Sequence, residues 1–143
     1  MTADLSAARR MFAGLPVVAV ATLNPDGSPH VVPLWFVWPD DAIFMSTRRD
    51  SRTWRNAAAD PRVALTVDVG RGWTELAGVS VSGAVELLTP DRPTMRKPIS
   101  AWHEKYRSLL AGEGFARFTE EVAALGFLRL VPERLVGWDH ARR

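Results

Sequence analysis

The stretch VVAVATLNPDGSPHVVPLWFVW, residues 17–38, decides the fold class. Both of its ends, VVAVATL at 17–23 and HVVPLWFVW at 30–38, are apolar and rich in valine. The residues between them, NPDGSP at 24–29, are turn formers. Two β-prone runs joined by such a turn predict a β-hairpin.

The remaining pattern extends this hairpin into an antiparallel meander. Further strands are expected at 42–47, 62–69 and 76–88, and two more within 126–139. Gly78 and Gly83 in the long run at 76–88 indicate a bulge or a sharp bend. Because the strands do not alternate with long helices, the sequence predicts a mainly β fold, a small antiparallel barrel of six to seven strands, rather than a Rossmann fold.

Three segments have helical patterns and are expected at the periphery of the barrel. The first follows a cap at Asp4 or Ser6 and stops at Gly14, and the second lies between Ser51 and Pro61. The third spans 91–124, with interruptions expected at Pro98 and at Gly112 to Gly114.

Composition narrows the class of protein. A chain of 143 residues is the size of one domain, so a single domain over 1–143 is expected. A formal net charge of +2 gives little reason to expect a nucleic-acid partner, and the absence of cysteine excludes disulfides and thiol chemistry. No run approaches the roughly 20 apolar residues of a membrane span, so a cytoplasmic protein without a membrane partner is expected.

Common catalytic motifs are absent from the sequence. The three histidines, His30, His103 and His140, have no metal-ligand spacing, so no metal site is predicted. Neither a nucleophile elbow nor a phosphate-binding or dinucleotide-binding glycine motif occurs.

The stretch FMSTRRDSRTWRN, residues 44–56, is the candidate binding site. Ser46 and Thr47 end a predicted strand, and a helical turn begins near Arg52. Hydroxyl groups, backbone N–H groups and guanidinium groups gathered at a helix start suit a phosphate. A solvated loop with arginines paired to Asp50 and Asp60 explains the same residues equally well.

The aromatic residues of the hairpin need two surfaces. In a strand, Trp35 faces opposite to Phe36 and Trp38, so one set enters the core and the other meets something else. A partner subunit or a flat ring-shaped ligand is the expected second surface.

Taken in order, residues 17–38, the segment IFMSTRRDSRTWRNAAADPRVALTVD and the closing LVPERLVGWD resemble a known superfamily. It comprises the flavin- and deazaflavin-dependent oxidoreductases, which are split β-barrels related to pyridoxamine 5′-phosphate oxidase and have an FMN-binding fold. The similarity covers roughly residues 10–139 and is greatest to the small single-domain branch that uses the deazaflavin coenzyme F420.

This resemblance implies a homodimer with cofactor sites between the two barrels and a small-molecule substrate. The implied cofactor is coenzyme F420, with FMN as the alternative, and hydride transfer to a small conjugated compound is the implied reaction. The implied cofactor-binding residues are Val32, Pro33, Leu34 and Trp35 along the ring, Thr47, Arg48, Ser51, Arg52 and Arg55 at the phosphate, and Trp138 near the dimer cleft.

One position departs from the family pattern. Thr53 stands where a lysine is common, and Arg48 could compensate for the missing cation. No catalytic residue is assigned, and core or surface roles are expected for His103 and Tyr106. A flavin-binding or haem-binding module without turnover is the alternative outside the enzyme class.

Overall fold

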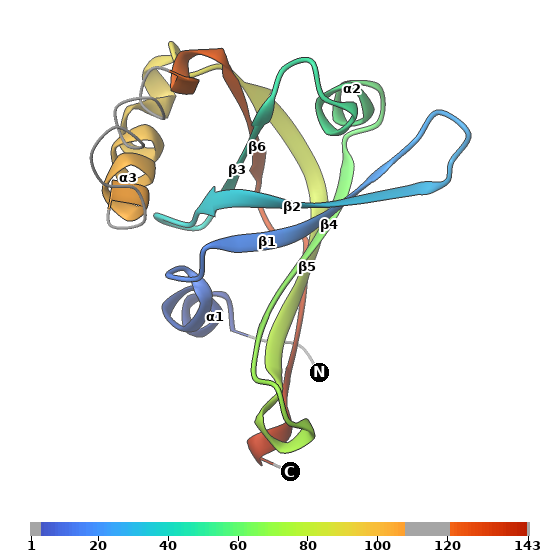
Figure 1. Ribbon diagram of the computed structural model, residues 1–143, viewed down its shortest axis with the longest axis vertical. Coiled ribbons are helices and arrows are strands. Elements are labelled where there is room, and N and C mark those ends of the chain that lie inside the picture. Colours follow the sequence, from blue (N-terminus) through green and yellow to red (C-terminus); the bar gives the residue numbers. More distant parts are fainter. Residues whose placement is uncertain (1–3, 108–120, 143) are drawn as a thin grey trace.

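The computed structural model describes residues 4–107 and 121–142 (Figure 1). Seven strands lie within these ranges: β1 (Val17–Leu23), β2 (Pro29–Val37), β3 (Ile43–Arg48), β4 (Arg62–Val69), β5 (Ala77–Leu88), β6 (Leu125–Leu130) and β7 (Arg134–Asp139). Three α-helices accompany them: α1 (Leu5–Phe12), α2 (Arg52–Ala59) and α3 (Arg96–Arg107). Short 3₁₀ turns occupy Trp73–Glu75, Pro93–Met95, Val122–Ala124 and His140–Arg142.

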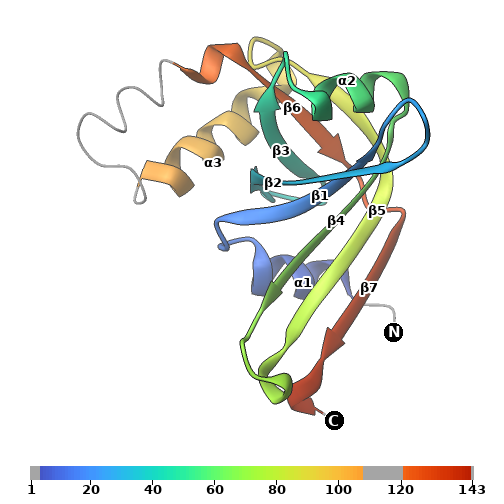
Figure 2. The same cartoon turned by 45° about the vertical axis from the view of Figure 1, so that its right-hand side comes forward.

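Six of the strands close into an antiparallel barrel in the order β1, β2, β3, β6, β5, β4. The pairing of β4 with both β1 and β5 completes the ring, and β7 adds to the first half of β5. β4, β5 and β7 continue beyond the barrel as a ribbon that ends near the C-terminus (Figure 2). The predicted mainly β barrel with peripheral helices is confirmed.

The hairpin that decides the fold forms as predicted. β1 pairs with β2 from Val17 opposite Trp35 to Leu23 opposite Pro29. Between them Asp26 accepts hydrogen bonds from the Ser28 backbone and hydroxyl at 3.0 and 2.5 Å, which lowers the pKa of Asp26. Gly27 has a φ of 84°, a conformation that glycine adopts at little cost.

Two apolar clusters lie on opposite faces of β3. Ile43 and Met45 point into the barrel, whereas Phe44 packs in a second cluster with Trp102 and Tyr106 of α3. Covering of both faces explains why five of the six β3 residues are buried. Helix α3 therefore packs on the outside of the barrel wall (Figure 1).

One local prediction was wrong, and for another, one of its two alternatives is excluded. Pro98 does not interrupt a helix, because it lies in the first turn of α3, where its missing N–H leaves no hydrogen bond unmade. β5 carries no bulge against β4 at Gly78 or Gly83. It changes neighbours instead, from β7 up to Ser82 to β6 from Val85. The interruption expected at 112–114 lies outside the described residues.

A pH-dependent contribution to stability is expected from Lys105 on α3. Burial lowers the pKa of its amine from 10.5 to about 8. Between these values the unfolded chain binds a proton that the folded chain has lost, so the free energy of unfolding should rise with pH from about 8 towards 10. Lys105→Met should flatten this rise, measured as urea midpoints at about pH 7.5 and 9.5.

The control for this test is Lys97→Met, because Lys97 is the only other lysine and is exposed beside Asp40. Tyr106 does not interfere in this range. Burial raises its pKa above the usual 10, so its effect on stability is confined to more alkaline solutions. Equal slopes for Lys105→Met and the unmodified protein would contradict the assignment.

Candidate functional site

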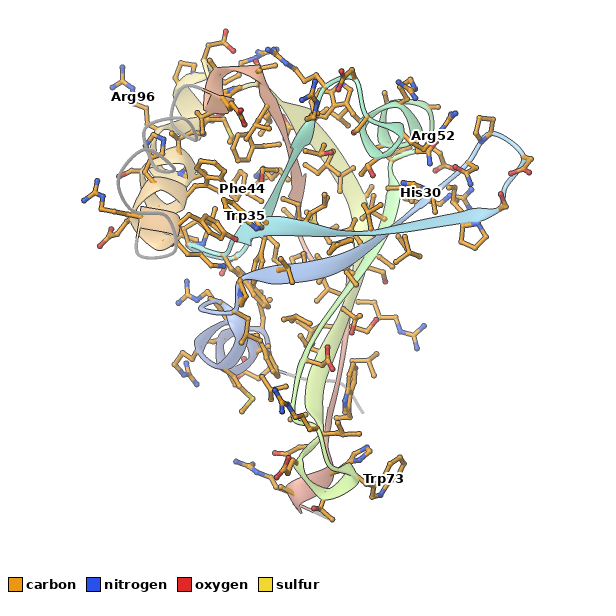
Figure 3. All side chains as sticks on the ribbon, viewed as in Figure 1. His30, Trp35, Phe44, Arg52, Trp73 and Arg96 are labelled. Carbon is orange, nitrogen blue, oxygen red and sulfur yellow. The ribbon has the colours of Figure 1, made fainter. Side chains whose placement is uncertain are left out.

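A cleft of about 330 Å³ lies between β2, β3, the start of α2 and helix α3. Its lining residues are Leu34, Trp35, Ser46, Thr47, Arg48, Ser51, Trp102, Glu121 and Leu125. Five of these, Leu34, Trp35, Thr47, Arg48 and Ser51, are among the predicted site residues. Trp35 lies where β2 meets α3, and Arg52 lies on α2 (Figure 3).

One wall of the cleft is apolar and aromatic. Leu34 packs against the barrel core, and Trp35 packs against the α3 cluster. The rings of Trp35 and Trp102 lie 6.0 Å apart and are tilted by 53°. A surface of this kind suits the face of a flat ring.

Another part of the cleft lining presents hydroxyl groups at the N-terminus of α2. The Thr47 and Ser51 hydroxyl oxygens lie 2.9 Å apart, and the Ser51 hydroxyl accepts the Trp54 N–H at 3.1 Å as the N-cap of α2. Within the described chain, the backbone N–H groups of Arg52 and Thr53 have no acceptor. These two donors at a helix N-terminus are suited to an anion.

The four arginines of this segment have different partners. Arg48 pairs with Asp50 at 3.0 Å, which lowers the pKa of Asp50, and Arg55 donates to the Asp50 carbonyl at 2.6 Å. Arg49 donates to the carbonyls of residues 123 and 124. Arg52 is exposed and has no partner among the described residues. The solvated-loop interpretation thus holds for Arg48, whereas Arg52 keeps its guanidinium available.

The structure separates some predicted site residues from the cleft. Val32 and Pro33 come before Leu34 on β2 and do not line the cleft. Arg52 and Arg55 are exposed on α2 and do not line it either. Trp138 is on β7, where it pairs with Gly78 in the ribbon. Thr53 is the second residue of α2, and its side chain is buried on the inner side of the helix.

Three of the described lining residues were not predicted from the sequence: Trp102, Glu121 and Leu125. Trp102 lies in the segment 91–124 that was predicted to be helical. Its helical spacing to Tyr106 signals a shared face, but that signal does not say which strand the face covers. Glu121 and Leu125 carry no motif in the sequence.

Comparison with known proteins identifies the family. Residues 5–139 match the family model described as pyridoxamine 5′-phosphate oxidase. The chain belongs to this family. Its barrel is therefore the flavin-binding split barrel of the pyridoxamine 5′-phosphate oxidase family, as the resemblance implied. No curated protein matches the chain.

Solved structures show the same fold. A conserved hypothetical protein, Rv2991 from Mycobacterium tuberculosis, has 26% identity and a TM-score of 0.79, with 97% of this chain and 87% of that chain covered. An F420 reductase has 23% identity and a TM-score of 0.65, with 89% and 94% covered. HutZ, a haem storage protein from Vibrio cholerae, has 17% identity and a TM-score of 0.73, with 94% of each chain covered.

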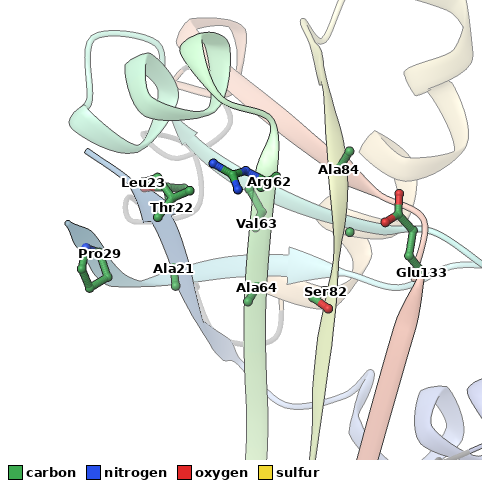
Figure 4. A pocket seen from close by; sticks show the side chains of 11 residues that line it. Ala21, Thr22, Leu23, Pro29, Arg62, Val63, Ala64, Ser82, Ala84 and Glu133 are labelled. Atoms are coloured by element: carbon green, nitrogen blue, oxygen red, sulfur yellow. The ribbon is translucent and has the colours of Figure 1, made fainter. Parts of the chain in front are cut away.

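A second hollow on this family member, of about 390 Å³, crosses the outer face of β1, β4 and β5 (Figure 4). Small side chains such as Ala21, Ala64 and Ser82 form its floor. Its one arginine, Arg62, is paired with Asp60 at 2.7 Å, and this contact lowers the pKa of Asp60 to about 2. The described lining of this hollow contains neither a helix terminus nor an aromatic residue. The cleft at Trp35 is therefore the better candidate.

Ionisable groups are few around the cleft. Of the described residues that line it, only Arg48 and Glu121 carry a charge. The three histidines lie on different elements, with His30 on β2, His103 on α3 and His140 after β7. Among the described residues, no helix is long and apolar enough to cross a membrane. The cleft can hold and orient a ligand, and its lining supplies little acid–base chemistry.

Proposed function

We propose that this member of the pyridoxamine 5′-phosphate oxidase family is an oxidoreductase that uses the deazaflavin coenzyme F420. It moves a hydride between the cofactor and a small conjugated organic substrate. The observation that carries the proposal is the composition of the cleft, which is lined both by the aromatic residues Trp35 and Trp102 and by Ser51, the N-cap of α2.

The residues present fit such a cofactor at both ends. Two backbone N–H groups without acceptors and the Arg52 guanidinium suit a phosphate diester, because all three are donors and two of them lie on the helix dipole. Leu34, Trp35 and Trp102 offer the apolar surface that a tricyclic ring needs.

When bound, the cofactor supplies the hydride chemistry. The chain's own residues have three tasks. The start of α2 and Arg52 hold the phosphate end, Trp35 and Leu34 orient the ring, and the apolar wall excludes water from the reacting face. No proton donor is assigned, since the described lining residues include no histidine, tyrosine or lysine.

FMN is the alternative cofactor for the same cleft. It shares the tricyclic ring and presents a phosphate monoester to the same donors. A flavin-binding or haem-binding module without turnover is also consistent with a cleft that has few ionisable groups. Since none of the described lining residues is a histidine, the cleft offers a haem iron no imidazole ligand from its own wall.

The proposal includes a homodimer. Trp138 lies in the ribbon of β4, β5 and β7, away from the cleft of its own chain, so it could reach a cofactor only in a second copy. Light scattering on the protein used for the titration below should give twice the chain mass of 15.8 kDa.

The test is a fluorescence titration of the purified protein with F420 and with FMN, followed by a turnover assay. We expect saturable binding of F420 that is tighter than binding of FMN, and oxidation of reduced F420 by an enone or a biliverdin-type acceptor. Tighter binding of FMN would select the alternative cofactor. Tight binding without oxidation across the acceptor panel would favour the module, and no binding would refute the site.

A further inference from the structure

Strand β2 changes the strand with which it pairs at Trp35, a residue of the cleft lining. β2 pairs with β1 as far as Trp35 opposite Val17, and with β3 from Phe36 opposite Met45. Main-chain groups at such a change of partner require other hydrogen-bond partners when they are buried. Phe36 is fully buried, so its N–H and carbonyl cannot rely on water.

Helix α3 supplies these partners through its side chains. The Tyr106 hydroxyl accepts the Phe36 N–H at 2.8 Å, and it lies 2.8 Å from the Pro16 carbonyl and 3.0 Å from the Phe36 carbonyl. Lys105 donates to the Phe36 carbonyl at 2.7 Å. One hydroxyl thus joins the residue before β1, the C-terminal end of β2 and α3, where a neighbouring strand would otherwise pair.

The same tyrosine fixes the aromatic wall. The rings of Tyr106 and Trp35 stack at 4.2 Å with an angle of 7° between their planes. Trp102 meets Tyr106 edge-on, and its Nε1 donates to the Ser46 hydroxyl, which in turn donates to the Trp35 carbonyl. Tyr106 and Trp102 are 0% and 1% exposed, whereas Trp35 is only partly buried and lines the cleft.

We propose that Tyr106 is a positioning residue of the cleft, which sets the plane of Trp35 and thereby determines which flat rings the cleft accepts. The inference that Trp35 receives a cofactor or substrate ring rests on the proposed function. The fixing of Trp35 by Tyr106 does not. Tyr106 acts through Trp35, because its own ring is buried behind the cleft wall.

Tyr106→Phe isolates the hydroxyl, because the ring that stacks on Trp35 remains. We expect the Phe36 amide to exchange its hydrogen at least tenfold faster relative to the Val20 amide in the same sample. We also expect the near-ultraviolet circular dichroism of the tryptophans to change. Riboflavin, which carries the ring without a phosphate, should bind at least threefold more weakly, and Tyr106→Leu should weaken it further.

Val79→Ala is the control, because it opens the fully buried barrel core at a site remote from the cleft. If Val79→Ala changed Phe36 exchange and riboflavin binding as much as Tyr106→Phe does, the effects of Tyr106 would come from a general loss of stability. That result would overturn the proposal. Unchanged Phe36 exchange in Tyr106→Phe would also overturn it. If the unmodified protein binds no flavin or deazaflavin, the proposed function fails, while the exchange and dichroism results still decide whether Tyr106 fixes Trp35.

Discussion

Gly126→Ala should lower the free energy of unfolding by about 1–3 kcal/mol and weaken cofactor binding at the same time. Gly126 lies on β6 opposite Thr47, directly beneath the Trp54 ring of α2. A Cβ there would lie 2.3 to 2.7 Å from three ring atoms of Trp54. Since a whole indole ring cannot yield as a flexible chain end does, α2 has to move.

The movement reaches the site because α2 carries both the anion donors and their cap. Ser51 begins the helix and contacts Thr47, which is the strand partner of Gly126. Urea unfolding followed by circular dichroism measures the stability loss, and the fluorescence titration measures binding.

Gly14→Ala is the matched control, because no heavy atom of the described chain, apart from Gly14 and its two neighbours, lies within 4 Å of a Cβ at Gly14. It should leave both measurements nearly unchanged. Gly126→Ala with unchanged stability would show that Trp54 does not rest on β6 as described.

The elements that local chemistry specifies could be predicted. The hairpin at 17–38 depends on β-branched runs and on turn residues a few positions apart, including Gly27 with its positive φ. The proposed anion site is local in the same way, since Thr47, Ser51 and the start of α2 lie within one short stretch. The interruption expected at Pro98 was wrong because the effect of a proline depends on its position, and Pro98 lies in the first turn of α3.

The aromatic wall could not be predicted, because it depends on contacts between distant segments. Alternation along β2 correctly separates Trp35 from Phe36 and Trp38, which are both in the barrel core. The predicted second surface, a partner or a ligand, was incomplete, since α3 of the same chain covers part of Trp35. Tyr106 is 71 residues away in the sequence, and no local pattern specifies which strand its helix will cover.

The sequence also could not predict which partner each arginine of the stretch 44–56 would have. Arg48, Arg49, Arg52 and Arg55 are equivalent by composition, and their roles differ only through the acceptors that the fold places nearby. Arg48 meets Asp50 in an exposed ion pair, with side chains 78% and 71% accessible. For Arg48 to bind a phosphate it would have to leave Asp50, so it is a weaker candidate than Arg52.

Arg52→Ala should weaken binding of F420 and FMN by about 10- to 150-fold, which corresponds to about 1.5–3 kcal/mol for a charge-assisted hydrogen bond. Arg52 is the first residue of α2, next to two backbone donors without acceptors, and has no competing partner among the described residues. Stability should change little because the side chain is exposed.

Three comparisons make the test of Arg52 specific. Arg49→Ala removes an equally exposed guanidinium that is bound to the carbonyls of residues 123 and 124, so it should leave cofactor affinity nearly unchanged. Arg52→Lys keeps the charge without the planar fork and should fall between the other two variants. Binding of riboflavin should be unaffected by Arg52→Ala, because riboflavin has no phosphate.

The salt dependence gives an independent measure of the same contact. A charge-assisted contact at an exposed site weakens as ionic strength rises, so the affinity of the unmodified protein for F420 should fall between about 0.05 and 0.5 M salt. The fall should be smaller for Arg52→Ala, which has one cation fewer at the phosphate. Equal salt dependence in the two proteins would place the phosphate away from the start of α2. The same conclusion would follow if Arg52→Ala weakened riboflavin binding as much as it weakens F420 binding.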